Sequence, residues 1–176
     1  DQGAADFDAE DLIAEEDMAI TISHFGYIKR LALDSYRAQR RGGRGATGIK
    51  VRDEDFVEHL FVASTHSYIL FFTDKGRCHW VKVHQIPVAG RQARGKAIVN
   101  LLGLAEGERV TGRVPVSDFD ENKYLLTATR KGVVKKTKLS EYSHPRRGGI
   151  VALTLREGDE LIAASIATKD QDVILA

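Results

Sequence analysis

The sequence is poor in several residue types that mark common protein classes. It contains one cysteine, Cys78, which excludes an internal disulfide and fits a reducing compartment such as the cytoplasm. No apolar run approaches the ~20 residues of a membrane-spanning helix. Residues 1–17 contain no Lys or Arg, so they lack the basic start of a secretory signal. The six histidines show no zinc-ligand spacing, and no group of acid, base and nucleophile stands out. We therefore expect a cytoplasmic, non-catalytic chain without metal, cofactor, membrane span or small-molecule substrate.

The charges are distributed unevenly, although the net charge is only +1. Residues 1–17 hold eight of the 25 acidic residues and none of the 26 basic ones. The rest of the chain therefore carries a net charge of +9. A basic body suggests a polyanionic partner. Composition alone leaves open the alternative of a solubilising acidic tail on an ordinary domain.

One strand-turn-strand pattern occurs three times along the chain. The copies cover residues 19–30, 68–80 and 123–136. Each has a glycine at its turn: Gly26, Gly76 and Gly132. Glycine adopts positive φ without steric cost, so these positions predict hairpin turns.

The second half of each copy also repeats. We expect Ile49, Ile98 and Ile150 each to open a strand that leads to an acidic turn, at residues 53–55, 106–108 and 157–159. A returning apolar strand follows each turn, at residues 56–64, 109–116 and 160–168. Units of about four strands and ~50 residues are typical of a bladed all-β fold. A plain β-sandwich is the alternative, but it leaves the matching of two separate turns in three copies to coincidence.

These repeats suggest a division of the chain. We assign residues 1–17 to an acidic linker and first-strand region, and 18–176 to one β domain. Its blades are expected at about 18–65, 66–120 and 121–170, with a further blade beginning at 171–176.

The spacing of apolar residues changes phase within each hairpin. Ile28, Cys78 and Val134 are expected to face inward. Residues an odd number of positions later are also expected to face inward: Leu31 and Leu33, Val81 and Val83, and Thr137 and Leu139. A β-bulge at 29–30, 79–80 and 135–136 reconciles the two phases and turns two neighbouring side chains outward. Two of the three pairs, Lys29-Arg30 and Lys135-Lys136, are doubly basic. In the third pair, we interpret Trp80 as a packing residue rather than a contact to nucleic acid.

Residues 39–45, here called the box segment, hold three arginines and three glycines. Glycine lets a backbone approach a phosphate, and arginine binds phosphate oxygens through two parallel hydrogen bonds. We interpret the segment as a loop that contacts a nucleic-acid backbone without reading its sequence. A solvated surface loop without function is the alternative. Residues 90–96 and 144–149 form similar Gly/Arg-rich loops in the later repeats.

The box segment resembles the gyrase A box of the C-terminal domain family of bacterial DNA gyrase A proteins. The residues before it, 26–30 and 36–38, and the repeats also resemble that family. The resemblance implies a β-pinwheel, a propeller-like ring in which neighbouring blades exchange strands. That ring has six blades, so this chain would hold about three, truncated, and the start of a fourth. It also implies DNA wrapped around a basic perimeter in support of ATP-dependent negative supercoiling. The expected partners are duplex DNA, the gyrase A N-terminal breakage-reunion domain and the gyrase B subunit. The catalytic sites would lie outside this chain.

The predicted DNA-binding residues fall into two groups. The first is the box segment: Gln39, Arg40, Arg41, Gly42, Gly43, Arg44 and Gly45. The second comprises other basic residues: Lys29, Arg30, Arg37, Lys50, Arg91, Arg94, Lys96, Lys135, Lys136, Lys138, Arg146 and Arg147. Two alternatives remain at this point. One is the related domain of topoisomerase IV, in which the box is usually degraded, and the other is a propeller that binds proteins through its faces.

Overall fold

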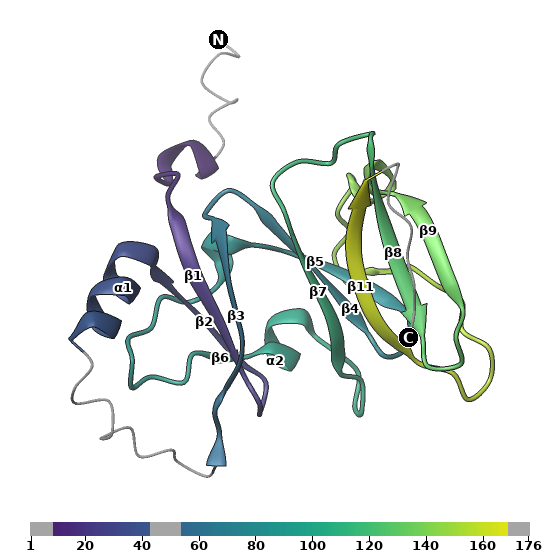
Figure 1. Cartoon of the computed structure of the whole chain (residues 1–176), viewed down its shortest axis with the longest axis horizontal. Helices are drawn as coiled ribbons and strands as arrows, with labels where there is room; N and C mark the ends of the chain where they lie inside the picture. Colours follow the sequence, from purple (N-terminus) through teal and green to yellow (C-terminus); the bar gives the residue numbers. More distant parts are fainter. Residues whose placement is uncertain (1–8, 43–53, 169–176) are drawn as a thin grey trace. The chain divides into compact units, whose positions relative to one another are not determined.

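The computed structural model describes residues 9–42 and 54–168, and most of its regular structure is antiparallel β-sheet (Figure 1). The chain divides into two compact units. The first consists of residues 1–67 and 82–101, and the second of residues 68–81 and 102–176. No helix among the described residues is long and apolar enough to cross a membrane.

A four-stranded sheet forms the centre of the first unit, in the order β3-β1-β2-β6. Its strands are β1 (Asp17–Ser23), β2 (Tyr27–Ala32), β3 (Val57–Ser64) and β6 (Lys96–Ala97). The unit also contains the short helices η1 (Ala9–Leu12), α1 (Leu33–Arg41) and η4 (Val83–Gln85). Strand β6 comes from the second sequence repeat, yet it pairs with β2, with Lys96 opposite Ile28. The sheet is therefore completed by the following repeat.

The second unit contains two sheets. One has the order β10-β5-β4-β7, and the other has the order β11-β8-β9. Their strands are β4 (Tyr68–Thr73), β5 (Arg77–Lys82), β7 (Val110–Val116), β8 (Lys123–Thr129), β9 (Val134–Lys138), β10 (Ile150–Val151) and β11 (Leu161–Thr168). Strand β10 belongs to the third repeat but pairs with β5, with Ile150 opposite Cys78. The exchange seen in the first unit is thus repeated, and the predicted strand at Ile150 is confirmed.

The three predicted hairpin turns are confirmed. Gly26, Gly76 and Gly132 have φ angles of 87°, 80° and 89°. Each glycine N–H donates to the carbonyl three residues earlier, at 2.9 to 3.0 Å. A side-chain hydroxyl at that earlier residue also accepts the N–H of the first residue after the glycine. The three hydroxyl residues are Ser23, Thr73 and Thr129.

The acidic turns serve these same hairpins. Glu108 is buried, and its Oε2 accepts the Thr73 hydroxyl at 2.7 Å. Asp159 bonds to Thr129, and its Oδ1 also accepts the Lys131 amide at 2.9 Å. Asp55 has the corresponding place in the first repeat, where its Oδ1 accepts the Phe25 amide at 2.9 Å. These carboxylates therefore hold the hairpins closed, as a role in turns rather than catalysis requires.

This arrangement predicts acid sensitivity in the second unit. Burial favours the neutral form of Glu108, but hydrogen bonds from Thr73 and from the Ala105 amide outweigh it and leave the pKa below its usual range. A carboxylate with a lowered pKa stabilises the fold fully above its ordinary pKa of 4.5, and this contribution disappears as the pH falls toward the lowered value. Replacing Glu108 with Gln should lower the stability of the chain near pH 7 and flatten its decline below about pH 4.5. Urea unfolding at several pH values measures both effects; an unchanged acid decline would exclude Glu108 as its source.

A second α-helix corrects the expectation of a strand opening at Ile98. The chain pairs as β6 for only two residues and then forms α2 (Ile98–Leu102). The Ile98 amide donates to the Gly26 carbonyl at 2.8 Å, and the Ile98 side chain is buried. The side chain is thus buried as an apolar residue should be, but on a helix. The corresponding strand predicted at Ile49 lies outside the described residues.

The prediction of β-bulges at 29–30 and 135–136 is wrong. The β1–β2 register runs unbroken from Ile22–Ile28 to Met18–Ala32, and the β8–β9 register is also continuous. The phase changes because the strands end there: Leu33, Val83 and Leu139 begin helical segments, and Val83 and Leu139 are buried from those segments. On the outer strand β9, Val134 is 44% exposed, against the expectation that it faces inward.

The core of the second unit is built from both of its sheets. Leu70, Phe72 and Cys78 pack with residues of β8 and η5 (Leu139–Tyr142). Trp80 packs against this core, and its indole N–H donates to the Tyr142 carbonyl at 2.8 Å. The interpretations of Cys78 as a core residue and Trp80 as a packing residue are confirmed.

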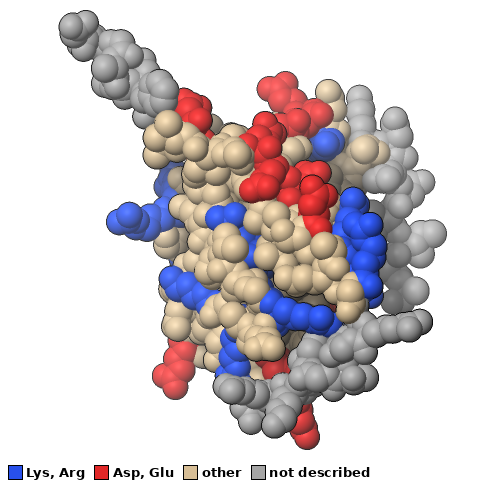
Figure 2. All heavy atoms as spheres, turned by 90° about the vertical axis from the view of Figure 1, so that its left-hand side faces the viewer, with Lys and Arg blue, Asp and Glu red and all other residues tan. Residues whose placement is uncertain are grey.

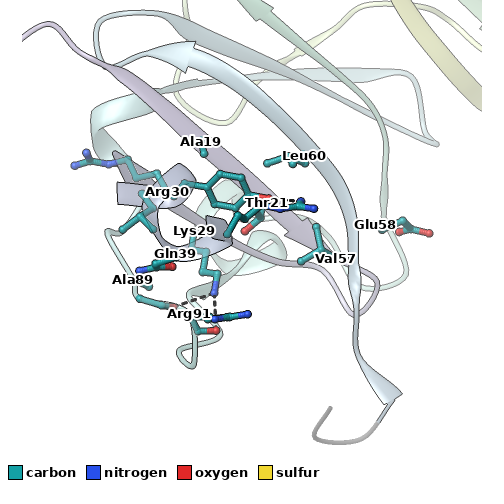
Figure 3. Close-up of a pocket in the computed structure, with 14 residues that line it drawn as sticks. Ala19, Thr21, Lys29, Arg30, Gln39, Val57, Glu58, Leu60, Ala89 and Arg91 are labelled. Carbon is teal, nitrogen blue, oxygen red and sulfur yellow. Dashed lines mark hydrogen bonds between the residues drawn. The ribbon is translucent and has the colours of Figure 1, made fainter. Parts of the chain in front are cut away.

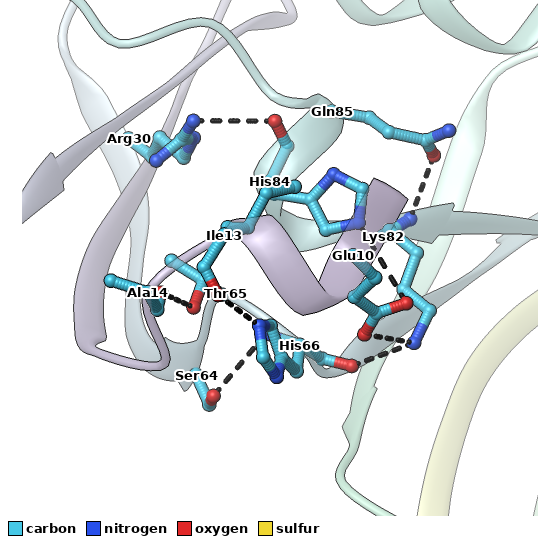
Figure 4. A network of polar contacts seen from close by, with 10 residues as sticks. All are labelled: Glu10, Ile13, Ala14, Arg30, Ser64, Thr65, His66, Lys82, His84 and Gln85. Atoms are coloured by element: carbon cyan, nitrogen blue, oxygen red, sulfur yellow. Dashed lines mark hydrogen bonds and ion pairs between the residues drawn. The ribbon is translucent and has the colours of Figure 1, made fainter. Parts of the chain in front are cut away.

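The described part of the acidic N-terminal segment is bound to the first unit through polar contacts (Figure 4). The Lys82 ammonium lies 3.0 Å from Glu10 Oε1. His66 Nε2 donates to the Ile13 carbonyl, and the Thr65 hydroxyl donates to the Ala14 carbonyl, both at 2.7 Å. The segment from Glu10 onward is therefore packed against the β domain rather than separate from it.

Candidate nucleic-acid interface

The box segment begins in the last turn of α1. Leu33–Arg41 contains Ala, Arg and Gln, which have high helix propensity, and the helix ends at Gly42. Its two final arginines are exposed and lie at the helix end where positive charge is favourable. The expected loop is thus corrected for Gln39, Arg40 and Arg41, which are helical. Gly43, Arg44, Gly45 and Lys50 lie outside the described residues.

An arginine and a tyrosine lie together on α1. Arg40 Nη1 donates to the Tyr36 hydroxyl at 3.2 Å, and the guanidinium carbon is 6.0 Å from the centre of the Tyr36 ring. The two residues are one helical turn apart, a spacing at which side chains meet. The sequence analysis included Tyr36 in the segment that resembles the family but not among the predicted site residues, although this spacing is visible once a helix is assumed. The contact directs Arg40 along the helix surface while leaving it exposed.

An open groove of about 630 Å³ lies beside this helix (Figure 3). Ala19, Leu31 and Leu60 from the sheet supply part of its apolar lining. Its polar lining comes from β2, from α1 and from the 89–91 loop, which is distant in sequence, together with Thr21 of β1 and the acidic Glu58 of β3. The polar lining residues include Lys29, Arg30, Tyr36, Gln39, Arg40 and Arg91. The fold therefore brings part of the box segment close to the basic loop of the second repeat.

Lys29 and Arg30 bind backbone carbonyls within the first unit. Lys29 Nζ donates to the carbonyls of residues 90, 91 and 93. Arg30 donates through Nε to the Ile86 carbonyl at 2.6 Å and through Nη2 to the His84 carbonyl at 3.2 Å. Burial lowers the pKa of both side chains. These two predicted DNA-binding residues are thus engaged with their own chain.

The other predicted DNA-binding residues in the described part of the first unit, outside the box segment, are exposed. Arg37 lies on α1, and Arg91, Arg94 and Lys96 lie on or next to the loop before β6. The Arg94 guanidinium carbon is 5.4 Å from the centre of the Tyr27 ring, a cation–π contact that leaves the arginine accessible. Figure 2 shows Lys and Arg side chains spread over one side of the molecule, with most of the visible Asp and Glu gathered toward its top and a few at its lower edge.

The second unit carries its own exposed basic residues. Lys136 Nζ lies 4.4 Å from the centre of the Tyr124 ring, and Lys135 Nζ donates to the Ala152 carbonyl at 3.2 Å. Lys138, on the same strand, is exposed, as are Arg146 and Arg147 in the loop before β10. Two of these lysines therefore contact their own chain yet remain at the surface. Within the residues that the structure describes, no group of three His, Cys, Asp or Glu side chains is placed to hold a metal ion.

The sequence repeats correspond to a known family. The family described as DNA gyrase C-terminal domain, beta-propeller, matches residues 17–64, 67–117 and 123–168. The chain belongs to the DNA gyrase C-terminal domain family. The all-β, propeller-type fold inferred from the repeats is thereby confirmed, with three sheets of three or four strands in the described residues.

Curated relatives carry the same family name. The DNA gyrase A protein of Haemophilus influenzae is 50% identical over 98% of this chain. That of Salmonella typhimurium is 47% identical over 98%, and that of Clostridium acetobutylicum is 45% identical over 97%. In each case the match covers 20% of the relative, so the chain spans about a fifth of the length of these proteins. The resemblance to gyrase A is thus confirmed.

Solved structures show the same fold. A crystal structure of the C-terminal domain of DNA topoisomerase IV matches with a TM-score of 0.72 and 30% identity, covering 88% of this chain and 46% of that one. A DNA gyrase A C-terminal domain matches with a TM-score of 0.63 and 17% identity, covering 88% of this chain and 49% of the other. The chain is therefore a C-terminal domain of the gyrase-type topoisomerases, and sequence identity places it with gyrase A.

Proposed function

We propose that this chain binds duplex DNA without sequence specificity and wraps it for negative supercoiling by a gyrase holoenzyme. One observation carries the proposal: exposed basic residues of two successive repeats lie on the same compact unit. Arg40 and Arg41 end α1, while Arg91, Arg94 and Lys96 belong to the loop and strand that complete the same sheet.

The chemistry of these residues suits phosphate better than bases. Exposed arginines offer paired donors that match phosphate oxygens. A protein that recognises DNA in this way gains affinity through release of counterions and not through base contacts. Bending DNA around a small domain costs several kcal/mol, so a single patch is insufficient and several must act together. The exposed Lys135, Lys136, Lys138, Arg146 and Arg147 supply further patches on the second unit.

The wrapping would act in the cytoplasm and within a larger enzyme. The gyrase A N-terminal breakage-reunion domain would cut and rejoin the DNA, and the gyrase B subunit would hydrolyse ATP. By wrapping DNA with one handedness, this chain would set the direction in which two DNA segments cross, and strand passage at that crossing would give a negative supercoil. It needs no cofactor for that role, because the interaction is one of charge and shape.

DNA binding should depend steeply on salt and little on sequence. If five basic residues of the first unit each neutralise one phosphate, the plot of log K against log salt has a slope of about −4.5. Affinity would then fall roughly 500-fold between 50 and 200 mM salt. Gel shifts with two unrelated duplexes of equal length test both expectations. Binding that did not respond to salt would contradict the phosphate-based mechanism, and absence of DNA binding would favour a protein-binding propeller.

Topoisomerase IV is a second candidate, because its C-terminal domain matches with 30% identity and a TM-score of 0.72. The two functions differ in product. With relaxed plasmid and ATP, a gyrase holoenzyme that contains this chain should introduce negative supercoils. Relaxation of supercoiled plasmid without any introduction of supercoils would favour the topoisomerase IV assignment.

A further inference from the structure

Lys29 has no remaining donor for a bound phosphate. A lysine ammonium carries three N–H donors and no acceptor. Lys29 Nζ lies 3.0 Å from the Gly90 carbonyl and 3.3 Å from that of Arg91 (Figure 3). It also lies 2.9 Å from the Ala93 carbonyl. All three donors are therefore directed at the backbone of one loop.

The same loop lies against β2 at a second point. Gly95 has a φ of 89°, and a Cβ atom there would lie 2.2 Å from the Ile28 carbonyl oxygen and 2.8 Å from Lys29 Cβ. Only glycine permits so close an approach. Directly afterwards, Lys96 pairs with Ile28 as β6 begins. The loop is thus fixed to β2 by Lys29 over residues 90–93 and by the glycine contact at 95.

We propose that Lys29 is a positioning residue, which fixes the 90–95 loop so that Arg91 and Arg94 are presented to DNA. Lys29 itself makes no phosphate contact. The loop's own arginines are exposed, whereas the lysine that holds the loop is only partly exposed. The proposal rests on the DNA-binding function proposed above, and it assigns Lys29 a role within the protein that makes that binding effective.

The second unit repeats the arrangement with different side chains. Gly149 has a φ of 77°, and a Cβ atom there would lie 2.6 Å from the Cys78 carbonyl oxygen. Cys78 occupies the same place in its hairpin as Ile28 does in the first, two residues after the turn glycine. Arg77 Nη2 donates to the Gly148 carbonyl. A basic side chain on the hairpin thus binds the loop of the following repeat in both units.

Amide exchange in the absence of DNA tests the contact itself. In the full chain, Lys29→Met keeps the aliphatic part of the side chain and removes all three donors. Exchange of the Ala93 amide, which donates to the Gly90 carbonyl at 3.2 Å, should become roughly tenfold faster. Lys136→Met removes a lysine that lies over a tyrosine ring in the other unit, and it should leave Ala93 unchanged. Unchanged exchange at Ala93 in Lys29→Met would overturn the proposal.

A double-mutant cycle tests the consequence for DNA. Lys29→Met should weaken binding severalfold in the native background and have little further effect once Arg91 and Arg94 are both replaced by Ala. Lys136→Met should weaken binding by the same factor in both backgrounds, as an independent phosphate contact does. If Lys29→Met behaves as Lys136→Met does, Lys29 binds phosphate directly and the proposal is wrong.

A charge-conserving variant gives a second comparison if Lys29→Met unfolds. Lys29→Arg retains the positive charge, but its planar guanidinium cannot direct three donors at the same three carbonyls. Faster Ala93 exchange and weaker DNA binding are expected; native values of both would overturn the positioning role. A native chain that binds no duplex DNA would refute the proposed function, whereas the exchange experiment would still decide whether Lys29 holds the loop.

Discussion

A gyrase that carries Ala in place of Arg40, Arg41 and Arg44 should lose negative supercoiling and keep ATP-driven relaxation. Arg40 and Arg41 are exposed at the end of α1, and Arg44 follows in the part of the box segment outside the described residues. Removing three phosphate contacts should reduce the salt slope of DNA binding by up to about 3. Wrapping would then no longer offset the cost of bending DNA, while the cleavage and ATP sites of the holoenzyme would be unaffected. Plasmid supercoiling and relaxation assays measure the two activities separately.

The fold should tolerate this triple change. No residue of α1 is buried, and Ala has a higher helix propensity than Arg. Thermal melting should therefore differ by only a degree or two from that of the native chain. Replacing Arg146 and Arg147 with Ala is the matched control, and it should lower affinity without abolishing supercoiling. Normal supercoiling by the triple variant would show that the box segment does not support wrapping, and unfolding would show that its arginines are structural.

Gly76→Ala should strongly destabilise the second unit. Gly76 has a φ of 80°, and an added Cβ would lie 2.3 Å from the Leu153 carbonyl oxygen. The Gly76 carbonyl also accepts the amides of Ala152 and Leu153, so the turn cannot move without loss of both bonds. Positive φ and overpacking together cost roughly 2 to 5 kcal/mol. Thermal unfolding should shift downward by on the order of 10 °C.

Gly132→Ala is the control for this effect, because it changes the equivalent turn of the third repeat. Its φ is 89°, yet no atom lies within 4 Å of the added Cβ. The substitution therefore adds backbone strain alone, about 1 to 2 kcal/mol. Equal destabilisation by the two variants would show that conformational strain, and not contact with Leu153, determines the requirement for glycine at Gly76.

The repeated turns were predictable from the sequence because each needs particular residue types. A positive φ at Gly26, Gly76 and Gly132 needs glycine, and each acidic turn supplies a carboxylate to the hairpin, as Glu108 does for the hydroxyl of Thr73. Both leave the same residue types at equivalent positions of each repeat. Family membership followed from that regularity together with the box segment.

The errors arose where the result depends on neighbours that are distant in sequence. Alternation of apolar residues cannot show that a strand ends and a helical segment begins, as at Leu33 and Leu139, and so bulges were inferred where the register is continuous. A two-residue strand followed by α2 could not be distinguished from a longer strand, because Ile98 is buried in either case. The roles of Lys29 and Arg30 were equally hidden, since their carbonyl partners lie more than 50 residues away. A basic residue in the sequence indicates charge, but not whether that charge is available to a ligand.

The exchange of β6 and β10 between repeats has a consequence for how a chain of β-blade repeats can gain or lose a repeat. Each complete sheet takes its last strand from the following repeat, so the sequence period and the structural period are out of step by about half a unit. If one whole sequence repeat were removed, the exchanged strand of a later repeat would have to pair with an earlier sheet. The glycine before that strand would then have to fit the hairpin of the earlier sheet, so Gly149 would take the place that Gly95 has against Ile28. Gene duplications that insert or delete blades would therefore retain a positive-φ glycine before every exchanged strand, even where the basic side chains around it differ.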